Sequence, residues 1–268
     1  MPNSIEESLE AAELAVFARK KLSLHAASDA GLPGRFESFS TGGLRASMAT
    51  ADQYDFLNTV EGVTELSAEA LPDVIKRFPD PCRITIVTTW PSQNLTVRLR
   101  GEGYEPAPVR PIAFLRLSPD WAQTQMGATP WRIREVSTQE EMTLFMDLLD
   151  GGYAASSEVG AFIRTEHALP DIRGFIASRN EQPLAAAAIS VHTTGAVLGG
   201  TAALPAARGT GAQTALLAYR LSFAADLGIS LATATAAPGS PSISNLSKLG
   251  FTIVERTAWR LNSHCPQP

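Results

Sequence analysis

The sequence has little of several residue types, and each shortage removes a class of protein from consideration. Its only two cysteines, Cys82 and Cys265, lie far apart and outside any metal-ligand spacing, which excludes a disulfide framework and a cysteine-based zinc site. The four histidines are scattered along the chain, at His25, His167, His192 and His264. We therefore expect no metal ion in this protein.

Positive charge and long apolar runs are also scarce. The 22 lysines and arginines are outnumbered by 27 aspartates and glutamates, and the net charge of −5 disfavours nucleic acid as a partner, because phosphate binding requires a basic face. No apolar run approaches the ~20 residues that cross a bilayer. Glu6 and Glu7 lie where a secretory signal would be basic. We expect a cytoplasmic protein that binds neither nucleic acid nor membrane.

The sequence does contain material for a substantial core. Hydrophobic residues make up 44% of the 268 residues and charged residues 18%, which is typical of a soluble globular protein with one large or two ordinary domains. Residues 91–117 and 241–261 share one order, a short helix opened by Pro-Ser, then glycine and an aromatic residue, then a strand. This self-similarity favours a duplicated unit, although many α/β units end in this way.

The most informative stretch is a glycine-containing loop between an apolar strand, expected over 196–203, and a helix, expected over 213–227. The apolar residues of the helix recur at three- and four-residue steps: Leu216, Tyr219, Phe223 and Leu227. Gly228 can end this helix in a left-handed conformation. The loop therefore leads into the N-terminus of a largely buried helix.

The chemistry of this loop points to a phosphate ligand. Gly209 and Gly211 have no Cβ, so the backbone can approach a ligand closely. The first N–H groups of the following helix have no partner within the helix and lie at its positive end. Arg208 adds a charged donor beside them.

Two common phosphate motifs fit poorly. The phosphate-binding loop of nucleoside triphosphatases requires Gly-Lys-Ser/Thr, whereas Gly211 is followed by Ala212 and Gln213. A dinucleotide fingerprint requires a third glycine, where this chain has Thr214, and an acidic residue after the next strand, which 231–236 lacks. Acyl-coenzyme A is the phosphate-bearing ligand that remains.

The loop resembles the central motif of the GNAT superfamily of acyl-CoA N-acyltransferases, Gln/Arg-x-x-Gly-x-Gly/Ala after a strand and often a proline. Pro205, Arg208, Gly209 and Gly211 match this motif, and Ala206 stands where glutamine or arginine is usual. Downstream, a strand, a short helix running into Leu249-Gly250-Phe251 and a last strand match the family's next motif. The resemblance covers roughly 131–261.

This resemblance implies the fold and the domain organisation. We expect an α+β protein with mixed, mostly antiparallel sheets flanked by helices, in two such units. Residues 1–118 would form a degenerate GNAT-like domain, because no glycine loop precedes a helix there. Residues 119–130 would be a linker, and residues 131–268 an acetyl-CoA-binding GNAT domain.

The resemblance also implies how acetyl-CoA is held, with main-chain N–H groups of the strand gripping the pantetheine and those of the loop the pyrophosphate. Two polar residues of the short helix lie near enough in the motif to bond the cofactor. The expected cofactor-binding residues are Ala202, Ala203, Leu204, Arg208, Gly209, Thr210, Gly211, Ala212, Ser242 and Asn245.

The catalytic residues are open. Relatives carry a tyrosine, the acid for the leaving thiolate, four residues before the glycine of Leu-Gly-Phe, and this chain has Leu246 there. The candidates are Glu158, His192 and Tyr153. Each has a structural alternative: a solvated carboxylate near a helix start, a surface histidine and a packing aromatic, respectively. Water can replace the acid.

The expected function is transfer of an acetyl group from acetyl-CoA to a primary amine of a small molecule, by direct attack and without a covalent enzyme intermediate, as the resemblance implies. Two alternatives stay open. One is a catalytically silent coenzyme A-binding or sensor protein, and the other is an N-acetyltransferase of proteins or peptides. We allow for a homodimer.

Overall fold

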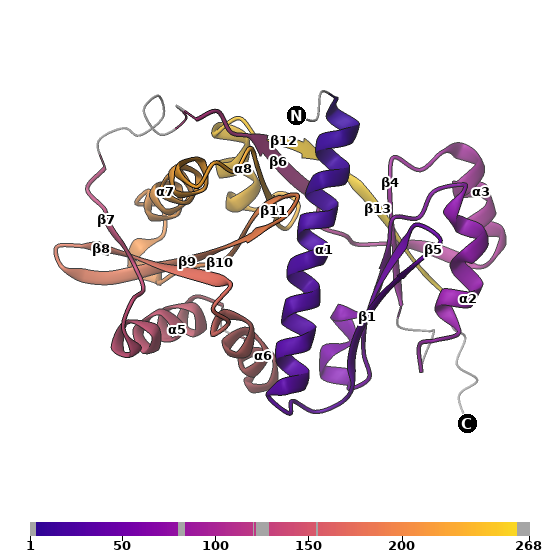
Figure 1. Cartoon of the computed structure of the whole chain (residues 1–268), viewed down its shortest axis with the longest axis horizontal. Coiled ribbons are helices and arrows are strands. Elements are labelled where there is room, and N and C mark those ends of the chain that lie inside the picture. Colours follow the sequence, from indigo (N-terminus) through magenta and orange to yellow (C-terminus); the bar gives the residue numbers. More distant parts are fainter. Residues whose placement is uncertain (1–3, 80–83, 120, 122–128, 154, 262–268) are drawn as a thin grey trace. The chain divides into compact units, whose positions relative to one another are not determined.

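The computed structural model describes residues 4–79, 84–119, 121, 129–153 and 155–261. The chain divides into two compact units, each discontinuous in sequence. The major unit comprises residues 1–19 and 112–253, and the minor unit residues 20–111 and 254–268 (Figure 1). The long helix α1 (Ile5–Asp29) contributes its residues up to Arg19 to the major unit and the rest to the minor unit.

The major unit is built around a seven-stranded sheet. Its elements after α1 are β6 (Ile112–Arg116), β7 (Arg132–Glu135), α5 (Gln139–Tyr153), α6 (Ser157–His167), β8 (Ile172–Arg179), β9 (Gln182–His192), β10 (Gly195–Ala203), η4 (Pro205–Ala207), α7 (Ala212–Asp226), β11 (Leu231–Thr235), α8 (Pro241–Lys248) and β12 (Thr252–Val254). The strand order is β12-β6-β11-β10-β9-β8-β7. β10 and β11 are parallel, whereas β7–β8, β8–β9, β9–β10 and β11–β6 are antiparallel.

Helices cover both faces of this sheet, with α7 on one face and α5 with α6 on the other (Figure 1). The alternation of side chains along β9 supplies both cores, because neighbouring residues of a strand point to opposite faces. Ala185, Ala187 and Ile189 join the core under α7. Ala186 and Ala188 join the core under α5. This run of small residues lets both helices pack closely on the central strands.

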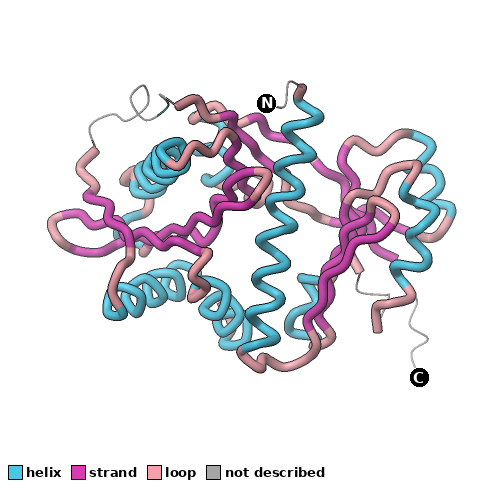
Figure 2. Tube along the Cα trace, in the orientation of Figure 1, coloured by secondary structure: helices cyan, strands magenta, loops and turns pink. Residues whose placement is uncertain are grey.

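The minor unit has a six-stranded sheet. Its elements are β1 (Phe36–Thr41), β2 (Leu44–Ala49), η1 (Asp52–Leu57), β3 (Thr59–Glu61), η2 (Ser67–Ala70), α2 (Leu71–Ile75), β4 (Thr85–Thr89), α3 (Gln93–Gly101), β5 (Tyr104–Ala107) and β13 (Arg256–Leu261). The strand order is β1-β2-β3-β4-β13-β5, with only β3 and β4 parallel. Figure 2 shows the strands and helices of this unit against the connecting loops.

The two sheets follow one topology, and each receives a strand from the other half of the sequence. β1-β2-β3-β4-β13-β5 corresponds in order to β8-β9-β10-β11-β6-β12, with the parallel pair at the same place. β6, from the first half, pairs with β11 over five residues. β13, from the second half, pairs with β4 and β5. Each copy of the internal repeat thus ends in a strand that lies in the opposite sheet.

The predicted α+β class, with mixed and mostly antiparallel sheets, is confirmed. The division of the chain differs from contiguous domains at 1–118 and 131–268, because β6 and β13 are exchanged between the sheets. Most of the expected linker, residues 120 and 122–128, lies outside the described residues. Gly151 and Gly152 lie in the last turn of α5 and do not end it. Among the described residues, no helix is long and apolar enough to cross a membrane.

The minor unit differs from the major unit where the glycine loop would lie. α2 has five residues, whereas α7, at the corresponding place, has 15. β3 also stays paired with β4 along its whole length, from Thr59 to Glu61. In the described part of the minor unit, a short helix and a closed strand pair therefore leave no opening comparable to the one described below for the major unit.

The strand exchange predicts how fragments fold. Fragment 131–268 lacks β6, which leaves β11 with an unpaired edge, and retains β13 without its sheet. Fragment 112–253 keeps every strand of the major sheet. We expect the thermal midpoint of fragment 131–268, followed by circular dichroism, to be lower than that of fragment 112–253 by roughly 10 °C or more. This difference corresponds to about a few kcal/mol in the free energy of unfolding at this size. Equal midpoints would contradict the exchange.

Candidate functional site

The site begins where the parallel strands β10 and β11 separate. Two residue pairs join them, Ala196 with Ala232 and Val197 with Thr233. Both strands continue beyond these pairs, β10 to Ala203 and β11 to Thr235, but in the described residues they no longer pair with each other. The main-chain groups of β10 beyond Val197 that face β11 are therefore available to a ligand lying between the strands.

A bulge in β10 lies just beyond this separation. Gly199 pairs with Ala188 of β9 and Ala202 pairs with Ala186, so three steps along β10 match two along β9. One extra residue is thus inserted on β10, which bends the strand and increases its local twist. Gly200, inside the bulge, has a φ of +60°, a left-handed conformation that favours glycine.

The glycine loop follows at the end of β10 and reaches the N-terminus of α7. Gly209 and Gly211 have φ values of +73° and +87°, and a Cβ on either would meet no atom within 4 Å. Gly211 is the N-cap of α7 and provides no side-chain cap. In the described structure, no hydrogen bond is donated by the main-chain N–H of Gly209, Gly211 or Ala212. These donors converge on open space at the positive end of a helix.

Two contacts fix the shape of this loop. The hydroxyl of Thr210 donates to the Ala207 carbonyl at 2.6 Å. The buried indole of Trp131 donates from Nε1 to the Thr210 carbonyl at 3.2 Å. The carbonyl is thereby turned towards the protein, which leaves the N–H groups on the outer side. Sequence reasoning placed Trp131 only in a strand, and no local signal connects it to a loop 79 residues later.

The three strand residues expected to contact acetyl-CoA differ in their main-chain roles. The N–H of Leu204 donates to the Leu184 carbonyl of β9 at 2.9 Å. Because N–H groups alternate sides along a strand, that of Ala202 also faces β9 and that of Ala203 faces the opening. Of the three, the N–H of Ala203 is thus the one that points away from β9.

Helix α8 lies beyond β11 and brings the remaining cofactor candidates. Ser242 and Asn245 are half-buried on this helix, whose N-cap Ser240 accepts from the Ile243 N–H. Leu246, at the position of the family's tyrosine, is only 4% exposed and packs in the core under α7. The position of the family's tyrosine therefore carries no proton donor in this chain.

A buried arginine of α7 contacts the bulge from the face of the sheet that α7 covers. Arg220 is 3% exposed and donates from Nη1 to the carbonyls of Ala188, at 2.8 Å, and Gly199, at 3.3 Å. Burial lowers its pKa to about 9, and nearby Tyr153 opposes this shift. Tyr153, a predicted catalytic residue, is 40% exposed. Because it affects the pKa of Arg220, it lies within electrostatic range of this arginine, which contacts the bulge.

Tyr153 is brought there by the end of α5. A Cβ on Gly152 would lie 2.4 Å from the Cβ of Ala202, and one on Gly151 would lie 3.0 Å from Leu204 Cδ2. The two glycines thus allow the last turn of α5 to touch β10 directly beside the opening. These glycines therefore serve close packing of the helix on the strand.

A buried polar cluster lies against the bulge on the face that α6 covers. Arg19 Nε donates to Glu166 Oε1 at 2.8 Å, and Arg19 Nη2 lies 3.3 Å from His167 Nε2. A Cβ on Gly199 would lie 2.9 Å from Arg19 Cζ, and one on Gly200 would lie 2.0 Å from His167 Nε2. Burial lowers the pKa of His167, which keeps its ring neutral.

His192, another predicted catalytic residue, is connected to this cluster. Its Nε2 lies 2.9 Å from the hydroxyl of Ser190, which is fully buried. Arg19 Nη1 lies 3.5 Å from the same hydroxyl. Burial and then the charge of Arg19 lower the pKa of the half-buried His192, and Asp171 opposes them.

The third candidate, Glu158, lies apart from this cluster. It is exposed in the first turn of α6, where its own backbone N–H and the hydroxyls of Ser157 and Ser156 lower its pKa. A carboxylate with a lowered pKa is a weak base. Its neighbours Ser156 and Ser157 line a small pocket at the junction of α5 and α6, and Glu158 itself does not.

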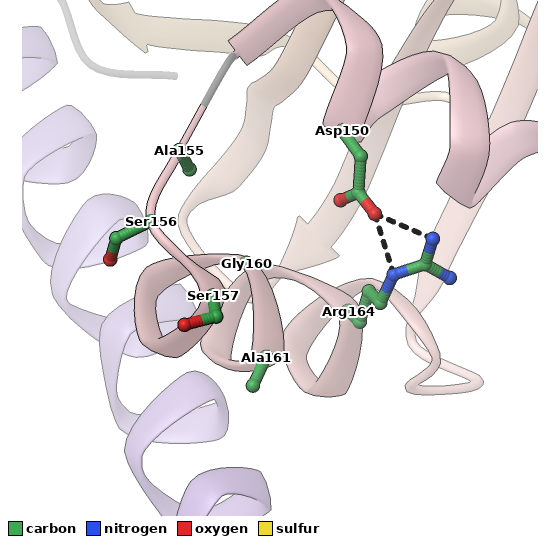
Figure 3. Close-up of a pocket in the computed structure, with 7 residues that line it drawn as sticks. All are labelled: Asp150, Ala155, Ser156, Ser157, Gly160, Ala161 and Arg164. Carbon is green, nitrogen blue, oxygen red and sulfur yellow. Dashed lines mark hydrogen bonds and ion pairs between the residues drawn. The ribbon is translucent and has the colours of Figure 1, made fainter.

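Figure 3 shows this pocket, whose volume is about 290 Å³. Its lining residues are Asp150, Ala155, Ser156, Ser157, Gly160, Ala161 and Arg164. Asp150, from the end of α5, points at Arg164 of α6, and Arg164 Nε donates to Asp150 Oδ2 at 2.7 Å. Arg164 Nη2 also binds Asp147 at 3.0 Å. Asp147 does not line the pocket, so the two charged lining residues, Asp150 and Arg164, balance each other.

Two parallel strands that separate at a bulge, followed by a glycine loop and a helix N-terminus, define the fold of the GNAT acyltransferases. Among solved structures, the chain is similar to a GCN5-related N-acetyltransferase from Kribbella flavida, with a TM-score of 0.61 and 16% identity over 94% of this chain and 96% of that one. A tandem GNAT protein from the clavulanic acid biosynthesis pathway matches with a TM-score of 0.58 and 12% identity over 98% of each chain.

A functionally unknown conserved protein from Staphylococcus epidermidis is also similar, with a TM-score of 0.60 and 14% identity over 88% of this chain and 98% of that one. No protein-family model and no curated protein matches the sequence. The chain therefore has the GNAT fold in a tandem arrangement, established by structure at low sequence identity.

The close contact beneath Gly200 gives a stability prediction. In Gly200→Ala the new Cβ collides with His167 and the residue must also hold a left-handed backbone, so we expect a loss of roughly 2–4 kcal/mol in the free energy of unfolding. Gly239→Ala is the matched control, because Gly239 has a φ of +68° with nothing within 4 Å. Its loss should be about 1–2 kcal/mol. Equal losses in urea titrations would argue against a tight bulge.

Proposed function

We propose that the protein is an acetyl-CoA-dependent N-acetyltransferase whose active centre is the opening between β10 and β11. The observation that carries this proposal is the joint presence of the separated strands and the bare glycine loop at the start of α7. The minor unit, with its closed strand pair, would not bind acetyl-CoA and would have another role.

The residues present suit acetyl-CoA. The open space above Gly209 and Gly211 is the cradle that a pyrophosphate needs, and a side chain there would fill it. The N–H groups of the loop and the exposed Arg208 would hold the pyrophosphate, with Ala203 facing the pantetheine and Ser242 and Asn245 at the side. When bound, acetyl-CoA supplies an acetyl thioester that an amine can attack directly.

The acceptor we propose is a primary amine of a small molecule. The pocket between α5 and α6 supports this choice, because its volume of about 290 Å³ is at the small end for ligand pockets. Asp150, which lines it, would offer a carboxylate oxygen to a cationic amine. The end of α5 connects this pocket to β10 through the contacts of Gly151 and Gly152.

The leaving thiolate needs a proton, and Tyr153 is the acid we propose. Its place at the end of α5, beside Ala202 and within range of Arg220, puts a phenol near the opening. Leu246 is buried and apolar, so α8 offers no acid at that position. The positive charge of Arg220 would stabilise the phenolate that forms when Tyr153 gives up its proton.

One observation favours a second candidate, a coenzyme A-binding protein without catalysis. The strand β10 carries no carboxylate, and α8 carries Leu246 in place of the family's acid. Tight acetyl-CoA binding with no release of thiol across a broad panel of primary amines would favour this candidate over the enzyme.

The glycine loop can be tested by a substitution at each end of α7. Gly211→Asp places a carboxylate against the expected pyrophosphate, and we expect acetyl-CoA binding to fall by at least about 100-fold in calorimetry, or roughly 3 kcal/mol. Gly228→Asp is the matched control, because Gly228 has a φ of +75° and the same open surroundings at the other end of the helix. Unchanged affinity in Gly211→Asp would refute the loop assignment.

The acid role of Tyr153 predicts a separation of binding from turnover. Tyr153→Phe removes only the hydroxyl, so kcat should fall by roughly 10²-fold while the Kd for acetyl-CoA stays unchanged. Tyr219→Phe, a tyrosine of α7 that packs on Phe175, is the control and should keep kcat. A Tyr153→Phe variant with the full kcat would show that water or another group protonates the thiolate.

A further inference from the structure

The buried polar cluster beside the bulge forms one continuous chain of contacts on a single face of the sheet. Ser190 pairs with Val197 and His192 with Gly195 across β9 and β10. Residues two apart on a strand share a face, so both side chains lie on the same face of the sheet. Ser190 lies opposite Val197, the last residue of β10 that pairs with β11, and His192 lies opposite Gly195, two residues before it. The guanidinium of Arg19 spans from the Ser190 hydroxyl to the space beside Gly199.

These contacts are arranged as in a catalytic base that is held in place by neighbouring polar groups. His192 is half-buried and reaches both solvent and the cluster, whereas Ser190 is fully buried. Among the described residues, the only hydrogen-bond partner of His192 is Ser190, through Nε2. If Nε2 carries the proton and donates to Ser190, Nδ1 is left with a free lone pair. A base held by a third group in this way is the usual arrangement for proton abstraction.

We propose that His192 is the catalytic base that takes a proton from the acceptor amine, and that Ser190 and Arg19 are its positioning residues; this inference rests on the proposed acetyltransferase function. The ammonium form of the acceptor transfers one proton to Nδ1 of His192, which becomes an imidazolium. The free amine then attacks the acetyl carbon, the carbon–sulfur bond breaks, and the thiolate takes the proton of Tyr153. The attacking nitrogen gives its second proton to the Tyr153 phenolate, directly or through water, which leaves a neutral amide, and the imidazolium releases its proton to solvent.

The contribution of Arg19 has a consequence for the domain organisation. Arg19 belongs to α1, outside the segment 131–261 that resembles a GNAT domain, and its ion pair with Glu166 joins residues 147 positions apart. The active centre of the major unit would thus be incomplete without the N-terminal helix. The strand β10 carries no carboxylate that could act as the base. His192, on the neighbouring strand β9, would fill this role instead.

The charges around His192 set the expected pH dependence. Arg19 from α1 lowers its pKa, Asp171 from the turn before β8 raises it, and burial lowers it further. Glu166 and His167 of α6 face Arg19 from the other side. The base is active when neutral, so activity should be present above the pKa of His192 and fall as the pH drops through it, below the ordinary value of 6.5.

The test uses NMR titration of the full chain labelled at its four histidines, with His192→Gln identifying the signal of His192. In Arg19→Met the loss of the positive charge should move the His192 midpoint to higher pH, while Arg19→Lys keeps the charge and should stay near the wild-type value. Arg116→Met is the control, because Arg116 also anchors α1, through Ser8 Oγ at 2.8 Å, but lies outside the cluster. The double variant R19M/E166Q removes the ion pair as a whole and should show the same upward shift if Arg19→Met folds poorly.

Turnover gives the second readout. With a pool of primary amines, His192→Gln should lower kcat/KM by at least about 10²-fold and abolish the acidic limb of the pH profile. Arg19→Met should move that limb to higher pH in step with the NMR midpoint. Suppose that calorimetry shows acetyl-CoA binding to the wild-type protein. An acidic limb that does not move in Arg19→Met, or that persists unchanged in His192→Gln, then overturns the role of His192 and leaves the proposed function standing. Absence of that binding overturns the proposed function and the inference together.

Discussion

The site depends on the point where two parallel strands stop pairing. β10 and β11 share two residue pairs and then separate, and a bulge places one extra residue in β10 at that point. A sheet interior that opens in this way leaves main-chain polar groups without ladder partners, which is costly unless other groups satisfy them. Arg220 satisfies part of this need on one face through the Gly199 carbonyl, and Arg19 with His167 fills the other face.

Helix α7 connects the two ends of this opening. Its N-terminus carries the glycine loop, and Arg220 lies eight residues after Ala212, about 12 Å further along the helix axis. The loop and the bulge are therefore held at a fixed separation by one buried helix, whose Leu216 and Leu221 are fully buried. Such rigidity is what a binding site for an extended ligand requires, because both ends are preorganised before binding.

Local pattern was sufficient for much of this structure. The apolar stripe of α7 placed that helix within one residue of its observed start, and the paired Pro-Ser and Gly-aromatic segments indicated the duplication. The exchange of β6 and β13 could not be predicted, because both are short strands with buried apolar side chains and either would suit either sheet. The cluster around Arg19 was also missed, since a charged residue on an amphipathic helix normally faces solvent and its partners lie 147 or more residues away. The hydrogen bond from Trp131 to Thr210 is hidden for the same reason.

The exchanged strands also constrain the order of assembly during synthesis. The indole of Trp259 in β13 donates to Thr88 of β4 across 171 positions in sequence, so the minor sheet stays open until β13, at residues 256–261, has been made. Contacts this distant are slow to form, because a long loop must close before they stabilise anything. The nascent minor unit would expose the edges of β4 and β5 to other chains in that interval, and a chaperone that shields strand edges would raise the yield of correctly paired protein.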